Sequence, residues 1–178
     1  MREVLTYRLS DATKVTLRPA TADDAAAIIA AVRSSADERS YVLMEVYGKD
    51  AAAQRAYIEQ LDREHNLFLV ATVAGTVVGI VALLDACRFC ATEPCLAAGV
   101  HLVREWRGRG IGSAMLRYAL RWAVEHGYRR VEADIFTANK RSLHLFRKAG
   151  FHEEACRRRA VQVGVQRISE VILARSLR

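Results

Sequence analysis

Long apolar runs are missing from this sequence of 178 residues. No run approaches the roughly 18 residues that a membrane-spanning helix requires, and Met1–Val4 does not open the apolar core of a secretory signal. Apolar residue types nevertheless make up 52% of the chain, enough for a sizeable core. We therefore expect a cytoplasmic protein with no membrane partner, folded as one domain over residues 1–178.

Cysteine is scarce as well. Four cysteines are too few for a disulfide scaffold in a chain of this length. Three of them, Cys87, Cys90 and Cys95, lie within nine residues, which raises the question of a structural zinc site. Such a site needs a fourth ligand, but Cys156 is remote and His101 falls in a predicted strand. We expect free thiols and no metal.

Hydrophobic periodicity divides the chain into strands and helices without repeats or low-complexity linkers. A hairpin is indicated where two apolar runs flank the turn at Ala74-Gly75. The order of strands and helices predicts a single α/β sheet. Strands are predicted at 3–9, 15–18, 67–73, 76–84, 96–103, 131–136, 151–160 and 168–177, and helices from about 23 to 33, 50 to 64, 111 to 126 and 141 to 148.

Two common phosphate-binding motifs are absent. No lysine stands where the P-loop of ATP- and GTP-using proteins needs one, and the dinucleotide fingerprint fails because Gly112 comes one residue early. The chain instead has a glycine-rich stretch, residues 108–112, between the apolar run Leu96–Val103 and an amphipathic helix. Such glycines expose backbone amides, and a helix start favours anions. With Arg107 and Arg109 beside it, this stretch predicts a site for a di- or polyphosphate.

Arg107–Gly112 matches the pattern Arg-x-x-Gly-x-Gly, which resembles the pyrophosphate-binding signature of the Gcn5-related N-acetyltransferases (GNAT). An ordinary glycine-rich turn with surface arginines is the alternative for this short pattern alone. Downstream, Asn139–Phe151 is similar to the family's second signature, Asn-x-x-Ala/Ser-x-x-Leu-Tyr/Phe-x-Lys-x-Gly-Phe. The resemblance, from about Val15 to Leu177, implies a mixed, mostly antiparallel sheet with helices on both faces and two strands splayed at the coenzyme site.

The resemblance also implies acetyl-coenzyme A as co-substrate and direct acetyl transfer to an amine. Backbone groups near Leu102 and Val103 would pair with the pantetheine arm and stabilise the developing oxyanion. Phe146 stands where many relatives have a tyrosine that protonates the departing thiolate, which phenylalanine cannot do. The residues expected at the coenzyme are Leu102, Val103, Arg107, Gly108, Arg109, Gly110, Ile111, Gly112, Ser113, Asn139, Ser142, Phe146 and Lys148.

An ammonium acceptor needs a base near neutral pH. Strand alternation in 131–136 puts Glu132 and Asp134 on one face. Asp134 lies five residues before Asn139. At the position of Asp134, the resemblance to ribosomal-protein alanine acetyltransferases implies a base. The alternative is that Asp134 is a surface acid paired with an arginine. Glu93 is a second candidate acid. The segment that covers the acceptor in this fold holds the expected substrate-binding residues Glu38, Tyr41 and Glu45.

Charge is unevenly distributed along the chain. Residues 1–103 hold 10 Lys/Arg and 13 Asp/Glu, whereas residues 104–178 hold 17 and 7. Coenzyme phosphates explain part of the basic excess, and the acidic half would face a cationic amine. We expect an acetyl-coenzyme A-dependent N-acetyltransferase acting on a primary amine of a small molecule or a peptide, with a homodimer left open. The alternatives are an acyl-coenzyme A sensor without turnover and a nucleic-acid binder using Arg157–Arg159, the last disfavoured because strand alternation divides these arginines between two faces.

Overall fold

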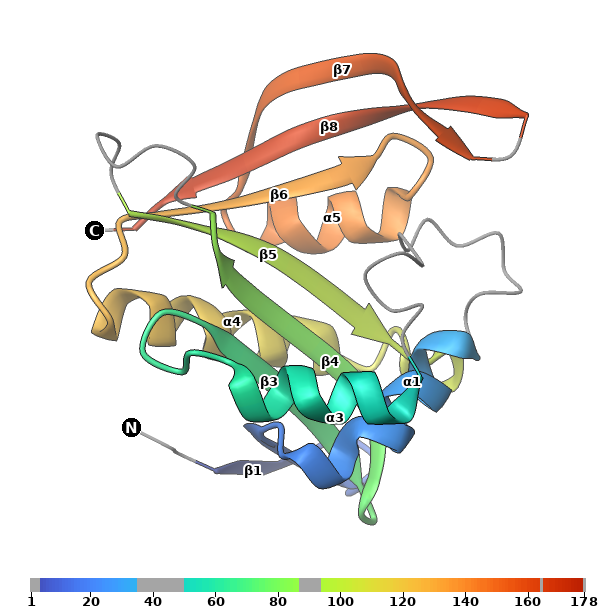
Figure 1. The fold of residues 1–178 in the computed structure, drawn as a ribbon, viewed down its shortest axis with the longest axis vertical. Coiled ribbons are helices and arrows are strands. Elements are labelled where there is room, and N and C mark those ends of the chain that lie inside the picture. Colours follow the sequence, from blue (N-terminus) through green and yellow to red (C-terminus); the bar gives the residue numbers. More distant parts are fainter. Residues whose placement is uncertain (1–3, 35–49, 87–93, 164, 178) are drawn as a thin grey trace.

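The computed structural model describes residues 4–34, 50–86, 94–163 and 165–177. Its centre is an eight-stranded sheet in the order β1-β2-β3-β4-β5-β6-β8-β7 (Figure 1). Neighbouring strands are antiparallel except β5 and β6, which are parallel. The predicted mixed, mostly antiparallel sheet is confirmed. The strands are β1 (Leu5–Arg8), β2 (Lys14–Pro19), β3 (Leu67–Val73), β4 (Thr76–Asp85), β5 (Cys95–Leu102), β6 (Arg130–Phe136), β7 (His152–Val163) and β8 (Gln166–Ser176).

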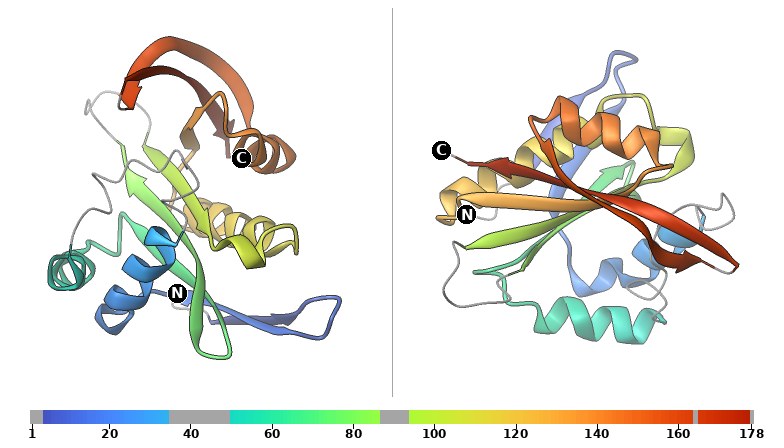
Figure 2. Two further views of the ribbon diagram at one scale, coloured as in Figure 1. Left: turned by 90° about the vertical axis from the view of Figure 1, so that its right-hand side faces the viewer. Right: turned by 90° about the horizontal axis from the view of Figure 1, so that it is seen from above.

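Helices cover both faces of the sheet (Figure 2). On one face, α1 (Ala25–Arg33) and α3 (Ala51–Gln60) form one hydrophobic cluster with the strands. On the opposite face, α4 (Ile111–Glu125) and α5 (Lys140–Lys148) form a second, larger cluster. Because β3 lies between the two layers, six of its seven residues are buried, which is why this strand reads as a continuous apolar run.

The α3 helix ends earlier than its sequence pattern suggests. Its start is fixed by the Asp50 side chain, which accepts a hydrogen bond from the Ala53 amide at 2.7 Å. We predicted a helix to about Glu64, but Leu61 is extended and the structure ends α3 at Gln60. The Asp62 carboxylate accepts a bond from the Glu64 amide and also contacts His65 Nδ1 at 2.7 Å, so a local turn replaces the last helical turn.

A partly buried ion pair joins β2 to the turn before α1, the 3-10 helix η1 (Ala22–Asp24). Both guanidinium nitrogens Nη1 and Nη2 of Arg18 lie 2.7 Å from the carboxylate oxygens of Asp24, which also accepts from the Thr21 amide. Burial opposes the charged form of Asp24, but the bonds from Arg18 and Thr21 outweigh it and hold the pKa of this carboxyl below its ordinary value.

The sheet opens between its two parallel strands. β5 and β6 pair only where Cys95–Ala97 meets Arg130–Glu132, although β5 continues to Leu102 and β6 to Phe136. Figure 1 shows the two strands diverging from that point. The strand that leads into α4 is β5, so the start of α4 lies at the wide end of the gap. The splay expected from the family resemblance is therefore present.

The outer hairpin of the sheet is long and charged. β7 has 12 residues and β8 has 11, whereas β6 has seven. All residues of β7 from His152 to Ala160 are exposed, and its register with β8 shifts twice. Among the described residues, no helix has the length and hydropathy needed to cross a bilayer.

Candidate coenzyme and acceptor site

The connection from β5 to α4 is a tight, well-braced loop. Val103 donates its amide to the Val78 carbonyl oxygen at 2.9 Å, and the loop then makes one 3-10 turn, η3 (Arg104–Trp106). Gly108 and Gly110 have φ of 77° and 85°, in the left-handed region that favours glycine. Because a Cβ at either glycine would meet nothing within 4 Å, conformation and not space requires glycine here.

Backbone amides gather at the start of α4. The first hydrogen bond of the helix runs from the Ala114 amide to the Gly110 carbonyl oxygen, at 3.0 Å. Among the described residues, no backbone acceptor is bonded to the amides of 108–113. Ile111 and Met115 are fully buried and fix the helix against the sheet. The loop therefore presents a rigid cluster of N–H donors at the positive end of a 15-residue helix, which suits an anion.

The two arginines of the first signature are held by the protein itself. Arg107 Nε donates to the Leu102 carbonyl oxygen at 2.8 Å and so ties the loop to the end of β5. The Arg109 guanidinium lies 4.9 Å from the centroid of the Trp106 ring and 3.2 Å from a carboxylate oxygen of Asp11 in the β1–β2 turn. Arg109 is about half exposed, so it adds positive charge beside the amides without being fixed in the core.

Leu102 and Val103 present their backbone groups in opposite directions. Backbone N–H and C=O groups of successive strand residues point to opposite sides of the strand. The Val103 amide donates to Val78 of β4, and the Val103 carbonyl oxygen accepts a bond from the Trp106 amide. Because Val103 bonds to β4, the alternation along β5 turns the backbone N–H and C=O groups of Val100 and Leu102 away from β4, toward the gap beside β6. Both Leu102 and Val103 were predicted at the coenzyme; of the two backbone amides, the one that faces the gap belongs to Leu102.

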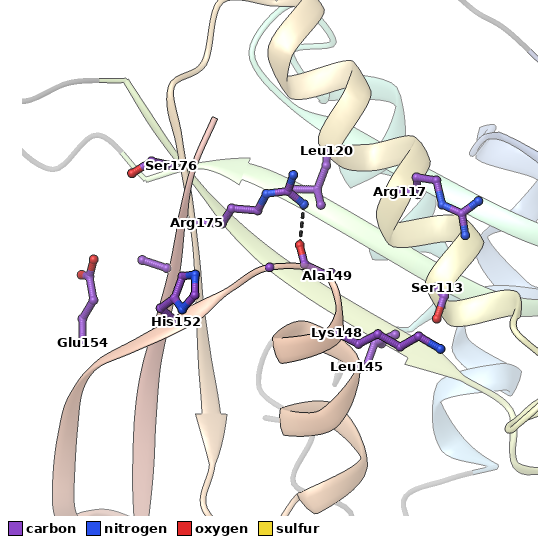
Figure 3. A pocket seen from close by; sticks show the side chains of 12 residues that line it. Ser113, Arg117, Leu120, Leu145, Lys148, Ala149, His152, Glu154, Arg175 and Ser176 are labelled. Atoms are coloured by element: carbon purple, nitrogen blue, oxygen red, sulfur yellow. Dashed lines mark hydrogen bonds between the residues drawn. The ribbon is translucent and has the colours of Figure 1, made fainter. Parts of the chain in front are cut away.

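A cleft of about 700 Å³ continues from the start of α4 (Figure 3). Ser113 and Arg117 line it from α4, and Lys148 lines it from α5. In Figure 3 the Lys148 side chain runs toward the first turn of α4, where Ser113 lies. Arg175 of β8 also lines the cleft, and it donates to the Ala149 carbonyl oxygen at the end of α5. The charged side chains of the lining are thus Arg117, Lys148, Arg175 and one acid, Glu154, so cations predominate.

The second signature forms the short helix α5 and its anchor. Asn139, which the family resemblance places at the coenzyme, caps the helix: its side chain accepts a hydrogen bond from the Ser142 amide at 3.1 Å. Phe146 is 1% exposed and packs edge-to-face on Phe151, with ring centroids 5.0 Å apart. An apolar ring therefore fills the position at which we noted the missing tyrosine.

The opposite face of β6 carries the predicted base. Asp134 is half exposed, and its Oδ2 lies 3.4 Å from Nη1 of Arg157 on β7. The same nitrogen lies 2.8 Å from a carboxylate oxygen of Glu170 on β8. The bond to Glu170, followed by the charge of Asp134, raises the pKa of Arg157. Pairing with an arginine, the alternative to a role as base, is thus observed for Asp134. The arginine lies 23 residues away in sequence.

His101 and Cys95, the described members of the proposed zinc group, have structural surroundings. His101 is buried, and its Nε2 lies 3.0 Å from the Ala31 carbonyl oxygen of α1. Burial raises the pKa of the Cys95 thiol to about 11. No group of three or more metal-binding side chains occurs in the described part of the chain. Cys87, Cys90 and Glu93 lie outside the described residues, as do the predicted acceptor residues Glu38, Tyr41 and Glu45.

One glycine that matters was missed in the sequence. A Cβ at Gly79 of β4 would lie 2.6 Å from Cδ1 of Leu102 and 3.0 Å from Sδ of Met115. Gly79 therefore allows the end of β5 and the α4 helix to approach β4 closely. Its signal was a lone glycine within an apolar strand pattern, which marks close packing.

Known proteins share this architecture. The model of the Acetyltransferase (GNAT) family matches residues 30–151. An uncharacterized N-acetyltransferase of Methanocaldococcus jannaschii is 32% identical over 112 residues, which cover 61% of this chain and 49% of that protein. The match thus spans about half the length of that curated relative.

Two solved structures resemble the fold closely. A ribosomal-protein-alanine N-acetyltransferase from Brucella melitensis has a TM-score of 0.82 at 24% identity, covering 90% of this chain and 99% of that one. A phosphinothricin acetyltransferase from Sinorhizobium meliloti, in complex with AcCoA, has a TM-score of 0.82 at 23% identity, covering 92% and 88%. These likenesses establish the fold, and the family match extends over more than half of the residues. This chain belongs to the Acetyltransferase (GNAT) family.

Proposed function

We propose that the protein transfers an acetyl group from acetyl-coenzyme A directly to a primary amine. The observation that carries the proposal is the row of open amides at the start of α4, at the wide end of the gap between β5 and β6. A diphosphate suits the amides, and a thioester arm suits the gap. The S. meliloti relative was crystallised with AcCoA, which supports the same ligand here.

The residues present fit this co-substrate. The amides of 108–113 would hold the pyrophosphate, and Arg109 would add charge. Lys148 and Arg117 line the adjoining cleft, and neither has an ion pair among the described residues. In this proposal they would take the third phosphate, on the ribose. Calorimetry of coenzyme A and its 3′-dephospho form tests this: wild type should prefer coenzyme A about tenfold, and Lys148→Ala should reduce that preference.

Acetyl transfer needs a polarised carbonyl and a neutral amine. The Leu102 amide faces the gap and would donate to the oxyanion that forms there, an effect typically worth a few kcal/mol. The acceptor ammonium first gives one proton to a base; the C–N bond then forms and the C–S bond breaks. A second proton leaves the nitrogen and ends on the thiol.

Asp134 is the base we propose, acting through water because its side chain is short. It lies on β6 two residues beyond Glu132, the last residue of β6 that pairs with β5. Asp134→Asn should lose turnover at neutral pH and retain coenzyme binding by calorimetry. Glu132→Gln, two residues earlier on the same face, is the matched control. Unchanged turnover in Asp134→Asn would remove Asp134 from this role.

A non-catalytic acyl-coenzyme A sensor is the second candidate, favoured by one observation. Phe146 offers no hydroxyl near the thiol and is buried in the core. Release of coenzyme A thiol in a screen of amines separates the two candidates. Turnover with any amine supports the enzyme, whereas tight coenzyme binding without turnover across the screen supports the sensor.

A further inference from the structure

Three charged side chains form a cluster on the sheet face opposite α4 and α5. Asp134 comes from β6, Arg157 from β7 and Glu170 from β8, and both carboxylates contact the same nitrogen, Nη1 of Arg157, at 3.4 and 2.8 Å. The Glu170 side chain is only 13% exposed. Three strands therefore hold one guanidinium between two acids, and we call this set the β6–β8 charge cluster.

Arg157 retains unused hydrogen-bonding capacity in this arrangement. A guanidinium has five N–H donors in a planar fork. Within the described residues, no acceptor is bonded to its Nε or Nη2. Since Nη1 is anchored by Glu170, the remaining edge is oriented, and a planar carboxylate matches such an edge with two parallel bonds.

The cluster lies beside the gap into which the thioester would extend. Pairing of β6 with β5 ends at Glu132, and Asp134 is the next residue on that face. Alternation places Asp134 away from Val131, Ala133 and Ile135, which face α4. The cluster thus approaches the gap from the side opposite α4, which is the side left for an acceptor.

We propose that the acceptor is a free α-amino acid, whose carboxylate binds the open edge of Arg157 and whose ammonium lies near Asp134, with the relay water between them. This inference rests on the proposed function and names its substrate class. An α-amino acid carries its ammonium and its carboxylate on one carbon. A site in which a carboxylate and the open edge of a guanidinium lie side by side can therefore bind both groups at once. A purely cationic amine would pair with Asp134 but would leave the open edge of Arg157 without a partner. A peptide N-terminus would offer the Arg157 edge only a neutral carbonyl oxygen, which accepts weaker bonds than a carboxylate does.

The test compares acceptors that differ only in the carboxylate. Thiol release is measured with a panel of α-amino acids, with their carboxamides, and with the amines that lack the carboxyl group, all at saturating acetyl-coenzyme A. For at least one side chain, kcat/KM of wild type should favour the amino acid over its carboxamide by about 10- to 100-fold. Calorimetry on the protein saturated with coenzyme A should show the same order of acceptor binding.

Variants locate the effect. Arg157→Gln should reduce the preference for the amino acid to about twofold or less, and Arg157→Lys should restore only part of it because lysine lacks the fork. Arg158→Gln is the matched control: Arg158 is the adjacent exposed arginine, with no ion pair in the described part of the chain, and the preference should be unchanged.

The outcomes separate this inference from the proposed function. If acetyl-coenzyme A does not bind, the proposed function fails and this inference fails with it. If the coenzyme binds and the best acceptors are carboxamides, peptides or simple amines, the enzyme stands and the amino-acid assignment is overturned. An unchanged preference in Arg157→Gln, with acceptor binding intact, would also overturn it.

Discussion

Replacing Gly110 with alanine separates the role of the α4 amides from general stability. Gly110 has φ of 85°, and a Cβ there would meet no atom within 4 Å, so the cost is conformational. For a residue with a Cβ this cost is about 1–2 kcal/mol. In a chain of this size it corresponds to a fall in Tm of about 2–8 °C. Relief of the strain would shift the following amides, and losing one or two bonds to phosphate should weaken acetyl-coenzyme A binding about 10- to 100-fold.

Gly127 provides a matched control at the other end of the same helix. Its φ is 80°, and a Cβ there would also meet nothing within 4 Å. Gly127→Ala should therefore lower Tm by a similar amount and leave the affinity for acetyl-coenzyme A unchanged. Thermal unfolding and calorimetry of both variants make the comparison. Equal affinities in the two variants would refute the assignment of the phosphate site to the start of α4.

Three further changes have expected outcomes. Asp11→Asn frees Arg109 from its ion pair, so acetyl-coenzyme A should bind about two- to fivefold more tightly by calorimetry at low salt, and the gain should shrink at high salt. Cys95, with a pKa of about 11, should resist alkylation at pH 8 while the exposed Cys156 reacts, as peptide mass spectrometry would show. Asp24→Asn should lower the free energy of unfolding by about 2–3 kcal/mol. Because folding lowers the pKa of Asp24, this loss relative to wild type should be full above pH 3.8, the pKa of an unfolded aspartate. It should disappear as the pH falls through the lower pKa of Asp24 in the folded protein.

Much of the framework was predictable because local patterns decide it. The helix from Ile111 follows from apolar residues at helical spacing, and its start from glycines whose positive φ the structure confirms. The α3 helix was overextended because Asp62 offers a competing turn through its own side chain. That competition depends on a few side-chain bonds, which periodicity does not register.

The site was less predictable because its key contacts cross long distances in sequence. Alternation placed Asp134 on the correct face, but its contact with Arg157 depends on pairing between β7 and β8 with two register shifts. The choice between the Leu102 and Val103 amides depends on register with β4, which Val78 reveals. Such registers come from the whole sheet, so single segments do not determine them.

The shape of the β7 strand also bears on how copies of this protein meet. An outermost strand with free amides and carbonyls is a template for pairing with another chain. Here Arg157, Arg158 and Arg159 follow one another, Arg159 has φ of 52°, and the register shift there bends the strand. Arg157 is compensated by two acids, but Arg158 and Arg159 have no ion pair among the described residues. A second copy would therefore find a kinked border with two repelling arginines there instead of a straight ladder. Crowded solutions of this protein should therefore resist fibre-like stacking along that border, and neutralising Arg158 and Arg159 would weaken this protection.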